Sequence, residues 1–292
     1  MHDTSRTNRV AVAGLLAGAL VWGLIWYPYR ALEAMGLSGV MASIATYAVA
    51  LAGALLAFPR MLRGVRWEWT LLWLSLAAGG CNLGYVVATV HGEVMRVLLL
   101  FYLSPLWTVL LARLLLDERV NRAGAGVIGL SVAGAAVMLW HPQIGAPWPK
   151  NGAEWVGMAS GFCFAVTNVL VRRTPHLPLE IKCSAVFLGV TLVGMAVLPF
   201  TDGSLLPHPP PMEAWMLVGL VGLVLLSINL AVQFGLTHTS ANRASVIFLS
   251  ELVVAALSSW LLAGEAMGPK EWTGGAMIVA ASLFSGRLAD GH

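Results

Sequence analysis

Charged residues are scarce in this sequence. Asp, Glu, Lys and Arg together make up only 11 % of its 292 residues, whereas ordinary soluble domains contain about 25 %. Hydrophobic residues make up 58 %, and so few charges cannot cover the surface of a water-soluble protein of this length. The composition therefore excludes an ordinary soluble domain and predicts that lipid is the main solvent of the chain.

Cysteine and catalytic motifs are also scarce. Cys81, Cys163 and Cys183 lie in or beside apolar segments and lack the spacing of a disulfide framework or a metal site, so we interpret them as packing residues. There is no nucleophile elbow, zinc-protease motif or Walker A motif, and the one G-x-G-x-x-G, at 124–129, lies in an apolar segment with no strand before it. We expect no enzyme activity, no metal and no cofactor.

Apolar segments of about twenty residues dominate the rest of the sequence. A helix of that length crosses a hydrocarbon core of about 30 Å. Ten such segments occur, at 10–29, 38–58, 69–90, 95–116, 123–140, 155–171, 183–200, 214–236, 242–263 and 270–287. The sequence predicts an all-α membrane protein with ten transmembrane helices embedded in a lipid bilayer.

Lysine and arginine are distributed unevenly about these segments. With the N-terminus inside, thirteen of the 17 basic residues fall on the inner side and four on the outer side. Basic residues are retained on the cytoplasmic side, so we expect both termini in the cytoplasm and the Pro-rich loops 141–150 and 207–211 outside. The net charge of +3 forms no basic stripe, which argues against a nucleic-acid partner.

The chain also repeats itself. A shift of 147 positions pairs Asn82 with Asn229, Arg96 with Arg243, and Phe101 with Phe248, so we divide the chain into two halves, 1–145 and 146–292. Because each half holds five predicted helices, the second half must enter the membrane upside down. Two inverted repeats of this kind are typical of transporters, which bind their substrate near the bilayer midplane.

Polar residues in the middle of apolar helices are the first candidates for a substrate site. They are Asn82 and Tyr85 on 69–90, Asn168 on 155–171, and Asn229 and Gln233 on 214–236. Each needs a partner or water at that depth. Hydrogen bonding between helices, worth about 0.6 kcal/mol on average, and the lining of a central cavity both explain them at this stage.

Aromatic residues form the second set of candidates: Trp22 and Trp26 on 10–29, Tyr102 on 95–116, Phe164 on 155–171 and Phe248 on 242–263. Most aromatic side chains in membrane helices face lipid or fill the bundle. Tyr102 and Trp26 are the strongest candidates for contact with substrate, because each lies at mid-depth and carries a polar group.

Glu251 is the one carboxylate predicted to lie deep in the membrane. An acidic residue at a helix centre costs about 2.5–3.5 kcal/mol on insertion scales, so Glu251 should face a cavity, pair with another group or be protonated. A proton carrier, a partner for a substrate ammonium group and a neutral buried acid all remain open. Arg96 and Arg243, at helix starts, are expected to anchor the chain at the interface.

Two short motifs resemble the drug/metabolite transporter superfamily, specifically its EamA-type branch with ten helices. The motifs are Val97–Trp107 followed by Asp117–Arg119 in the first half, and Phe248–Leu252 with Glu265 in the second half. The first also resembles the YddG-type exporters of aromatic and other amino acids. The resemblance implies a central cavity and export across a bacterial inner membrane. One departure is Leu252, where the family usually has proline, which puts a kink in that helix in doubt.

The leading hypothesis is therefore a secondary transporter that exports a small metabolite, most of all an aromatic or hydrophobic amino acid, by alternating access. Within transporters, an exporter of drugs or other metabolites is the alternative. A membrane-embedded sensing or binding protein is disfavoured by the short loops, and a lipid-modifying enzyme by the lack of an acid and a base at one depth.

Overall fold

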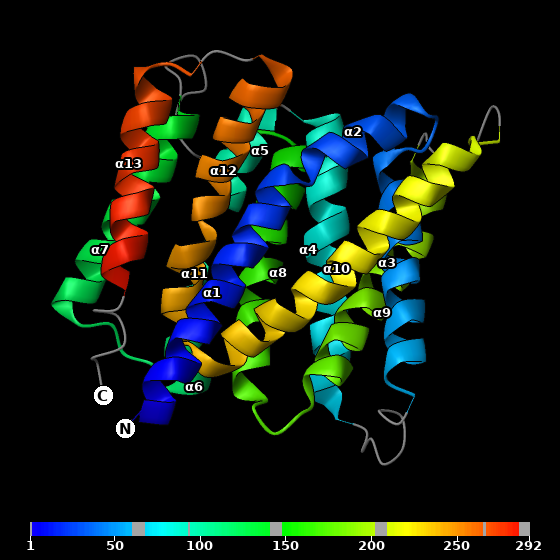
Figure 1. Cartoon of the computed structure of the whole chain (residues 1–292). Coiled ribbons are helices and arrows are strands. Elements are labelled where there is room, and N and C mark those ends of the chain that lie inside the picture. The colour runs from blue at the N-terminus through cyan, green and yellow to red at the C-terminus, as the bar shows by residue number, and fades with distance from the viewer. Residues whose placement is uncertain are drawn as a thin grey trace.

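The computed structural model describes residues 2–59, 68–92, 94–140, 148–201, 209–264 and 267–285. Every regular element in these ranges is a helix. Figure 1 shows one bundle, in which α1 (His2–Leu24) begins at the end of the bundle where α13 (Pro269–Phe284) finishes. We call this the terminal end and the opposite one the far end.

The other helices follow the predicted apolar segments closely. They are α2 (Trp26–Ala34), α3 (Gly39–Ala57), α4 (Trp69–His91), α5 (Val94–Phe101), α6 (Ser104–Leu116), α7 (Arg122–Leu139), α8 (Gly152–Arg173), α9 (Leu179–Val197) with the short η1 (Leu198–Phe200), α10 (Met212–His238), α11 (Ala241–Phe248), α12 (Ser250–Ser258) and η3 (Ser259–Ala263). The Pro-rich loops lie mostly outside the described residues.

Nine helical stretches in the described part of the chain are long and apolar enough to cross a membrane. Their outer surface carries large apolar side chains, of which Leu56, Phe200 and Leu283 are 79–86 % exposed. Such a surface suits lipid, and the expected all-α membrane fold is confirmed. Because α13 has only 16 residues, the count of ten crossings stays a prediction.

Three of the predicted helices are interrupted along their length. The interruptions fall at Ile25 between α1 and α2, at Tyr102 and Leu103 between α5 and α6, and at Leu249 between α11 and α12. Pro28 and Pro105 explain the first two, because proline has no N–H and its ring clashes with the carbonyl four residues earlier. Pro105 thereby ends α5 at Phe101.

The third interruption forms without a proline. Leu252 stands where the family resemblance led us to expect one, yet α11 ends at Phe248 and α12 begins at Ser250. The Leu252 N–H donates to the Leu249 carbonyl at 3.1 Å, three residues back, which is the tighter pattern of a helix end. The helix is therefore interrupted here without the residue that usually causes a break.

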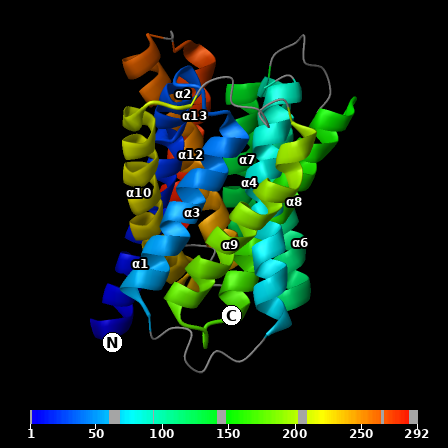
Figure 2. The same cartoon turned by 90° about the vertical axis from the view of Figure 1, so that its right-hand side faces the viewer.

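Small residues let the helices pack closely. A side chain at Gly189 on α9 would collide with the backbone of Ser75 on α4, and Gly134 on α7 and Gly274 on α13 each lie against the other's carbonyl. Close approach through glycine is the usual way in which membrane helices associate. Figure 2 shows the resulting arrangement, with α4 and α8 together on one side and α1 and α10 on the other.

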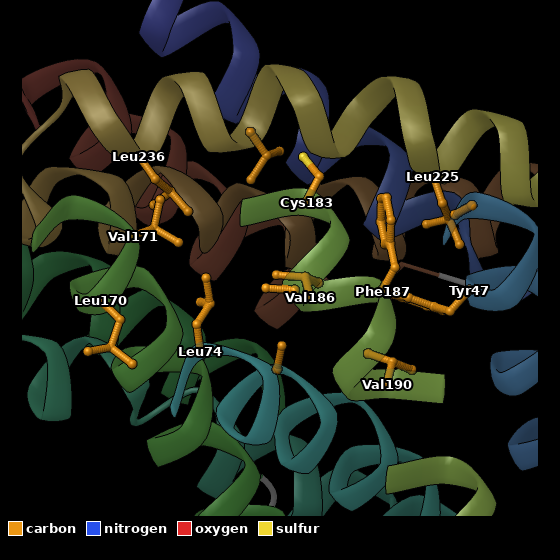
Figure 3. Packing of buried hydrophobic residues seen from close by; sticks show 14 of the residues in the cluster. Tyr47, Leu74, Leu170, Val171, Cys183, Val186, Phe187, Val190, Leu225 and Leu236 are labelled. Carbon is orange, nitrogen blue, oxygen red and sulfur yellow. The ribbon is translucent and has the colours of Figure 1, made fainter. Parts of the chain in front are cut away.

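The two apolar cores with the most members lie inside the bundle. The larger core fills the space between α3, α4, α9 and α10 and includes Tyr47, Leu74, Phe187 and Leu225 (Figure 3). The smaller core combines Leu99, Met138, Leu252 and Ile278 with other residues of α5, α7, α12 and α13. Phe164 on α8 packs against both cores, so the region between them is the centre of the molecule.

Candidate functional site

A continuous chain of aromatic rings crosses this central region. Each ring contacts the next with centroids 5.2–5.8 Å apart, within the range of favourable aromatic pairs. We call this set the aromatic chain, and its members in order are Trp22, Phe248, Phe164 and Phe101, with Tyr85 and Tyr102 both on Phe101. Five helices and the break after α5 contribute to it, and they come from both halves of the sequence.

The helix interruptions position two inner rings of the aromatic chain. Phe101 is the last residue of α5 and Phe248 the last residue of α11, so both rings stand where a helix stops. Gly161 on α8 lies directly against the backbone of Phe101, which lets α8 approach and bring Phe164 into contact. A local break and a glycine therefore place three rings in series.

Glu251 lies beside the aromatic chain in the first turn of α12. The Tyr102 hydroxyl faces its carboxylate, and Tyr85 and Cys81 on α4 are its other electrostatic neighbours. On α1, Gly23 packs against the Glu251 carbonyl without room for a side chain. Glu251 is thus fixed by α1, by α4 and by the break after α5.

Several residues of this region keep accessible surface although they lie inside the bundle. Cys81, Asn82, Tyr85, Phe164 and Glu251 are half-buried. Asn82 donates to the Tyr47 hydroxyl at 3.4 Å, and its own amide oxygen has no protein partner among the described residues. The face of α4 that carries Asn82 and Tyr85 therefore offers polar atoms that are not used by the fold.

The other expected residues lie on the same helices with different contacts. Asn229 is 3 % exposed and donates to the Leu225 carbonyl of its own helix at 2.9 Å. Asn168 and Gln233 are buried, and the Asn168 amide nitrogen and Gln233 amide oxygen have no partner in the described part of the structure. These buried, unsatisfied amide groups are compatible with a polar ligand or water nearby.

Trp26 is separate from the aromatic chain. Its indole N–H donates to the Ser258 hydroxyl at 2.9 Å, and Ser258 in turn donates to the Gly23 carbonyl at 3.2 Å. Its ring contacts Tyr27, with centroids 5.6 Å apart. Trp26 thus ties α2 to the end of α12, above the candidate site toward the far end.

Arg96 forms an ion pair at the far end of the bundle instead of reaching into the interface. Its Nε lies 2.7 Å from Oε1 of Glu154, its Nη2 lies 2.9 Å from Oε2, and both side chains are at most 5 % exposed. The backbone N–H of Lys150 also donates to the Glu154 carboxylate at 2.8 Å. This far-end ion pair joins α5 to the start of α8. The expectation of an interface anchor was wrong for Arg96, because sequence reasoning did not pair it with an acid 58 positions away.

Glu118 joins four helices at the terminal end. Its carboxylate accepts from the Ala241 N–H at 3.0 Å, at the first turn of α11, and lies 3.6 Å from Nε of Arg172 at the end of α8. Arg172 donates to the Thr237 carbonyl of α10. A carboxylate at a helix N-terminus is stabilised by the free N–H groups there. Both ends of the bundle are therefore cross-linked by acidic and basic side chains.

Comparison with known proteins shows which proteins this chain is similar to. The sequence model described as the EamA-like transporter family matches residues 151–287. A protein of Archaeoglobus fulgidus named as an uncharacterized transporter is 27 % identical over 80 % of this chain and 83 % of its own length. A riboflavin transporter of Brucella anthropi is 22 % identical over 80 % and 81 %. The pseudopaline exporter CntI of Pseudomonas aeruginosa is 25 % identical over 71 % of each chain.

A solved crystal structure has the same fold. It matches with a TM-score of 0.75 and covers 96 % of this chain and 97 % of its own, at 19 % sequence identity. At that identity the likeness concerns the fold alone.

Proposed function

The chain belongs to the drug/metabolite transporter superfamily, and we propose that it exports aromatic and hydrophobic amino acids by alternating access. That the protein is a membrane transporter of small metabolites follows from the family and from the names of its relatives. The aromatic chain with Glu251 beside it is the observation that supports amino acids as the substrate. A flat apolar side chain stacks favourably on such rings, and a carboxylate suits an amino group.

The packing of the two halves supports alternating access. α4 packs on α8 and α9, while α10 packs on α1 and α3. If 1–145 and 146–292 are inverted repeats, then α10 is the mate of α4, α1 of α8 and α3 of α9, so each contact has a counterpart. Exchange of the two arrangements between the halves would open the centre first to one side of the membrane and then to the other.

The charges at the two ends favour one orientation. Among the described basic residues, four lie at the far end, which are Arg30, Arg96, Lys150 and Lys270, and nine lie at the terminal end, which are Arg6, Arg9, Arg113, Arg119, Arg122, Arg172, Arg173, Lys182 and Arg243. By the positive-inside rule the terminal end is cytoplasmic. The location we propose is a bacterial inner membrane, with both termini in the cytoplasm.

Counterflow in liposomes that contain only the purified protein tests the function. Liposomes preloaded with unlabelled tryptophan should accumulate labelled tryptophan and phenylalanine faster than protein-free liposomes, and labelled glutamate should show no such gain. Riboflavin and pseudopaline belong in the panel because relatives carry those names. Counterflow of riboflavin without counterflow of any amino acid would replace the amino-acid proposal.

A further inference from the structure

Glu251 has no basic partner among the described residues. Its electrostatic neighbours are Tyr102, Tyr85 and Cys81, which are neutral side chains that titrate above neutral pH. The far-end ion pair already uses Arg96. A carboxylate in a region of low dielectric constant needs a counter-charge. Because no described basic side chain supplies one, a cationic group of the solute is suited to do so.

The rings beside Glu251 have the complementary property. Aromatic faces are negative at their centres and attract cations, with a gain of about 0.5–2 kcal/mol for each contact. Tyr85 and Phe101 are in direct contact at 5.2 Å, as are Phe101 and Tyr102, so the carboxylate and the rings surround one small region. Tyr85 and Glu251 are half-buried, so both keep surface that a ligand can contact.

We propose that Glu251 binds the ammonium group of the transported solute, so that this site prefers flat organic amines and rejects organic anions. A solute carboxylate would face Glu251 with no arginine or lysine near it among the described residues. The Tyr102 hydroxyl holds the Glu251 carboxylate toward the rings and is a positioning residue. The proposal rests on the proposed transport function and goes further, because it ranks an aromatic amine above the corresponding amino acid.

Three solutes that share an indole ring test the ranking. Tryptamine is a cation, tryptophan is a zwitterion and indole-3-propionate is an anion. Binding of labelled tryptamine to the purified protein, with the other two as competitors, should give affinities in the order tryptamine, tryptophan, indole-3-propionate. Glu251→Gln should weaken tryptamine binding about 10- to 100-fold, the loss expected for one charged hydrogen bond, and leave indole-3-propionate unchanged or slightly tighter.

Three further variants keep the experiment decisive. Glu251→Asp retains the charge and should preserve the order of the three solutes, while Glu213→Gln, which removes an exposed carboxylate from the first turn of α10, should change nothing. Tyr102→Phe should weaken tryptamine more than indole-3-propionate. Equal losses for all three solutes in Glu251→Gln, or no tryptamine binding to the wild type, would overturn the proposal. Tryptamine binding that depends on Glu251, without tryptophan counterflow, would instead overturn only the amino-acid proposal.

Discussion

Phe101 is the most connected ring of the candidate site. It contacts Tyr85, Tyr102 and Phe164 with centroids 5.2–5.8 Å apart, and 8 % of it is exposed. Sequence reasoning recorded Phe101 only as the repeat mate of Phe248 and did not include it in the site. The interruption after Phe248 has no proline to predict it, so the pairing in the repeat was the signal that the sequence offered for Phe101.

The first prediction concerns this ring. Phe101→Leu keeps an apolar side chain and removes three aromatic contacts, each worth about 0.5–1.5 kcal/mol. We expect the affinity for tryptophan to fall about tenfold in counterflow, with a smaller change for leucine. Phe162→Leu is the matched control, because Phe162 is 38 % exposed and contacts Trp107 outside the aromatic chain. Equal effects of the two substitutions would contradict the prediction.

The second prediction concerns pH. An ammonium group binds the charged form of Glu251, so protonation of the carboxylate competes with the solute. We therefore expect tryptamine affinity in the wild type to fall as the pH is lowered from about 8 to about 5, because a carboxyl group takes up its proton as the pH falls. Glu251→Gln should show weak binding without this dependence.

Proton coupling follows from the same competition. If a proton and a solute exchange on Glu251, an imposed pH gradient should accelerate counter-directed tryptamine flux in wild-type liposomes and leave Glu251→Gln unaffected. A gradient response of the same size in both proteins would show that Glu251 has no coupling role.

At the scale of elements, the bundle is held at both ends by polar contacts between helices from different halves. The far-end ion pair connects α5 with α8, and Glu118 connects α6 with the start of α11. The attraction within each contact does not translate directly into free energy of folding, because removing the charges from water costs several kcal/mol for each ion. The geometry of the far-end ion pair, with two short N–H···O bonds, offsets that cost.

The third prediction tests the far-end ion pair. Glu154→Gln leaves the buried Arg96 guanidinium without a counter-ion, and breaking such a pair typically costs about 3–5 kcal/mol. We expect a marked fall in Tm in detergent. The double variant Arg96→Met with Glu154→Met should recover part of the loss. Arg243→Gln is the control, since Arg243 donates to the neutral Asn8 and Ser285 side chains; a loss as large as that of Glu154→Gln would refute the special role of the pair.

At the scale of the whole molecule, the fold is a bundle in which helices from the two halves of the sequence contact each other, as α4 does with α8 and α9, and α10 with α1 and α3. The aromatic chain lies between the two apolar cores, and Phe164 packs against both. A change in the contacts between halves must therefore move the rings relative to Glu251. This coupling between a global rearrangement and the local site is what alternating access requires.

The fourth prediction fixes the orientation. In a variant with Cys81, Cys163 and Cys183 replaced by alanine, Gly152→Cys at the far end should react with a membrane-impermeant maleimide in intact cells. Pro175→Cys, exposed at the terminal end between α8 and α9, should react only after the cells are opened. The reverse pattern would place the terminal end outside.

The sequence by itself determined where the chain crosses the membrane. Backbone N–H and C=O groups must be satisfied within the segment in lipid, so an apolar stretch of about twenty residues can only be a helix. For that reason the predicted and observed bounds agree closely, as for 38–58 and α3 (Gly39–Ala57). Mid-helix position was also enough to select Glu251 and Tyr102 as candidates, because such residues are costly in lipid unless they have a partner.

Only the tertiary structure decided which of these side chains meet. Trp22 and Phe248 lie 226 positions apart and come within 5.3 Å, while Trp26, one turn from Trp22, bonds Ser258 instead. Arg96 meets Glu154 rather than the interface. Lipid solvates every apolar helix face equally well, so hydrophobicity explains why a helix lies in the membrane but not which helices it packs against. That choice depends on close contacts at small residues such as Gly161 and Gly189, which hydropathy does not register.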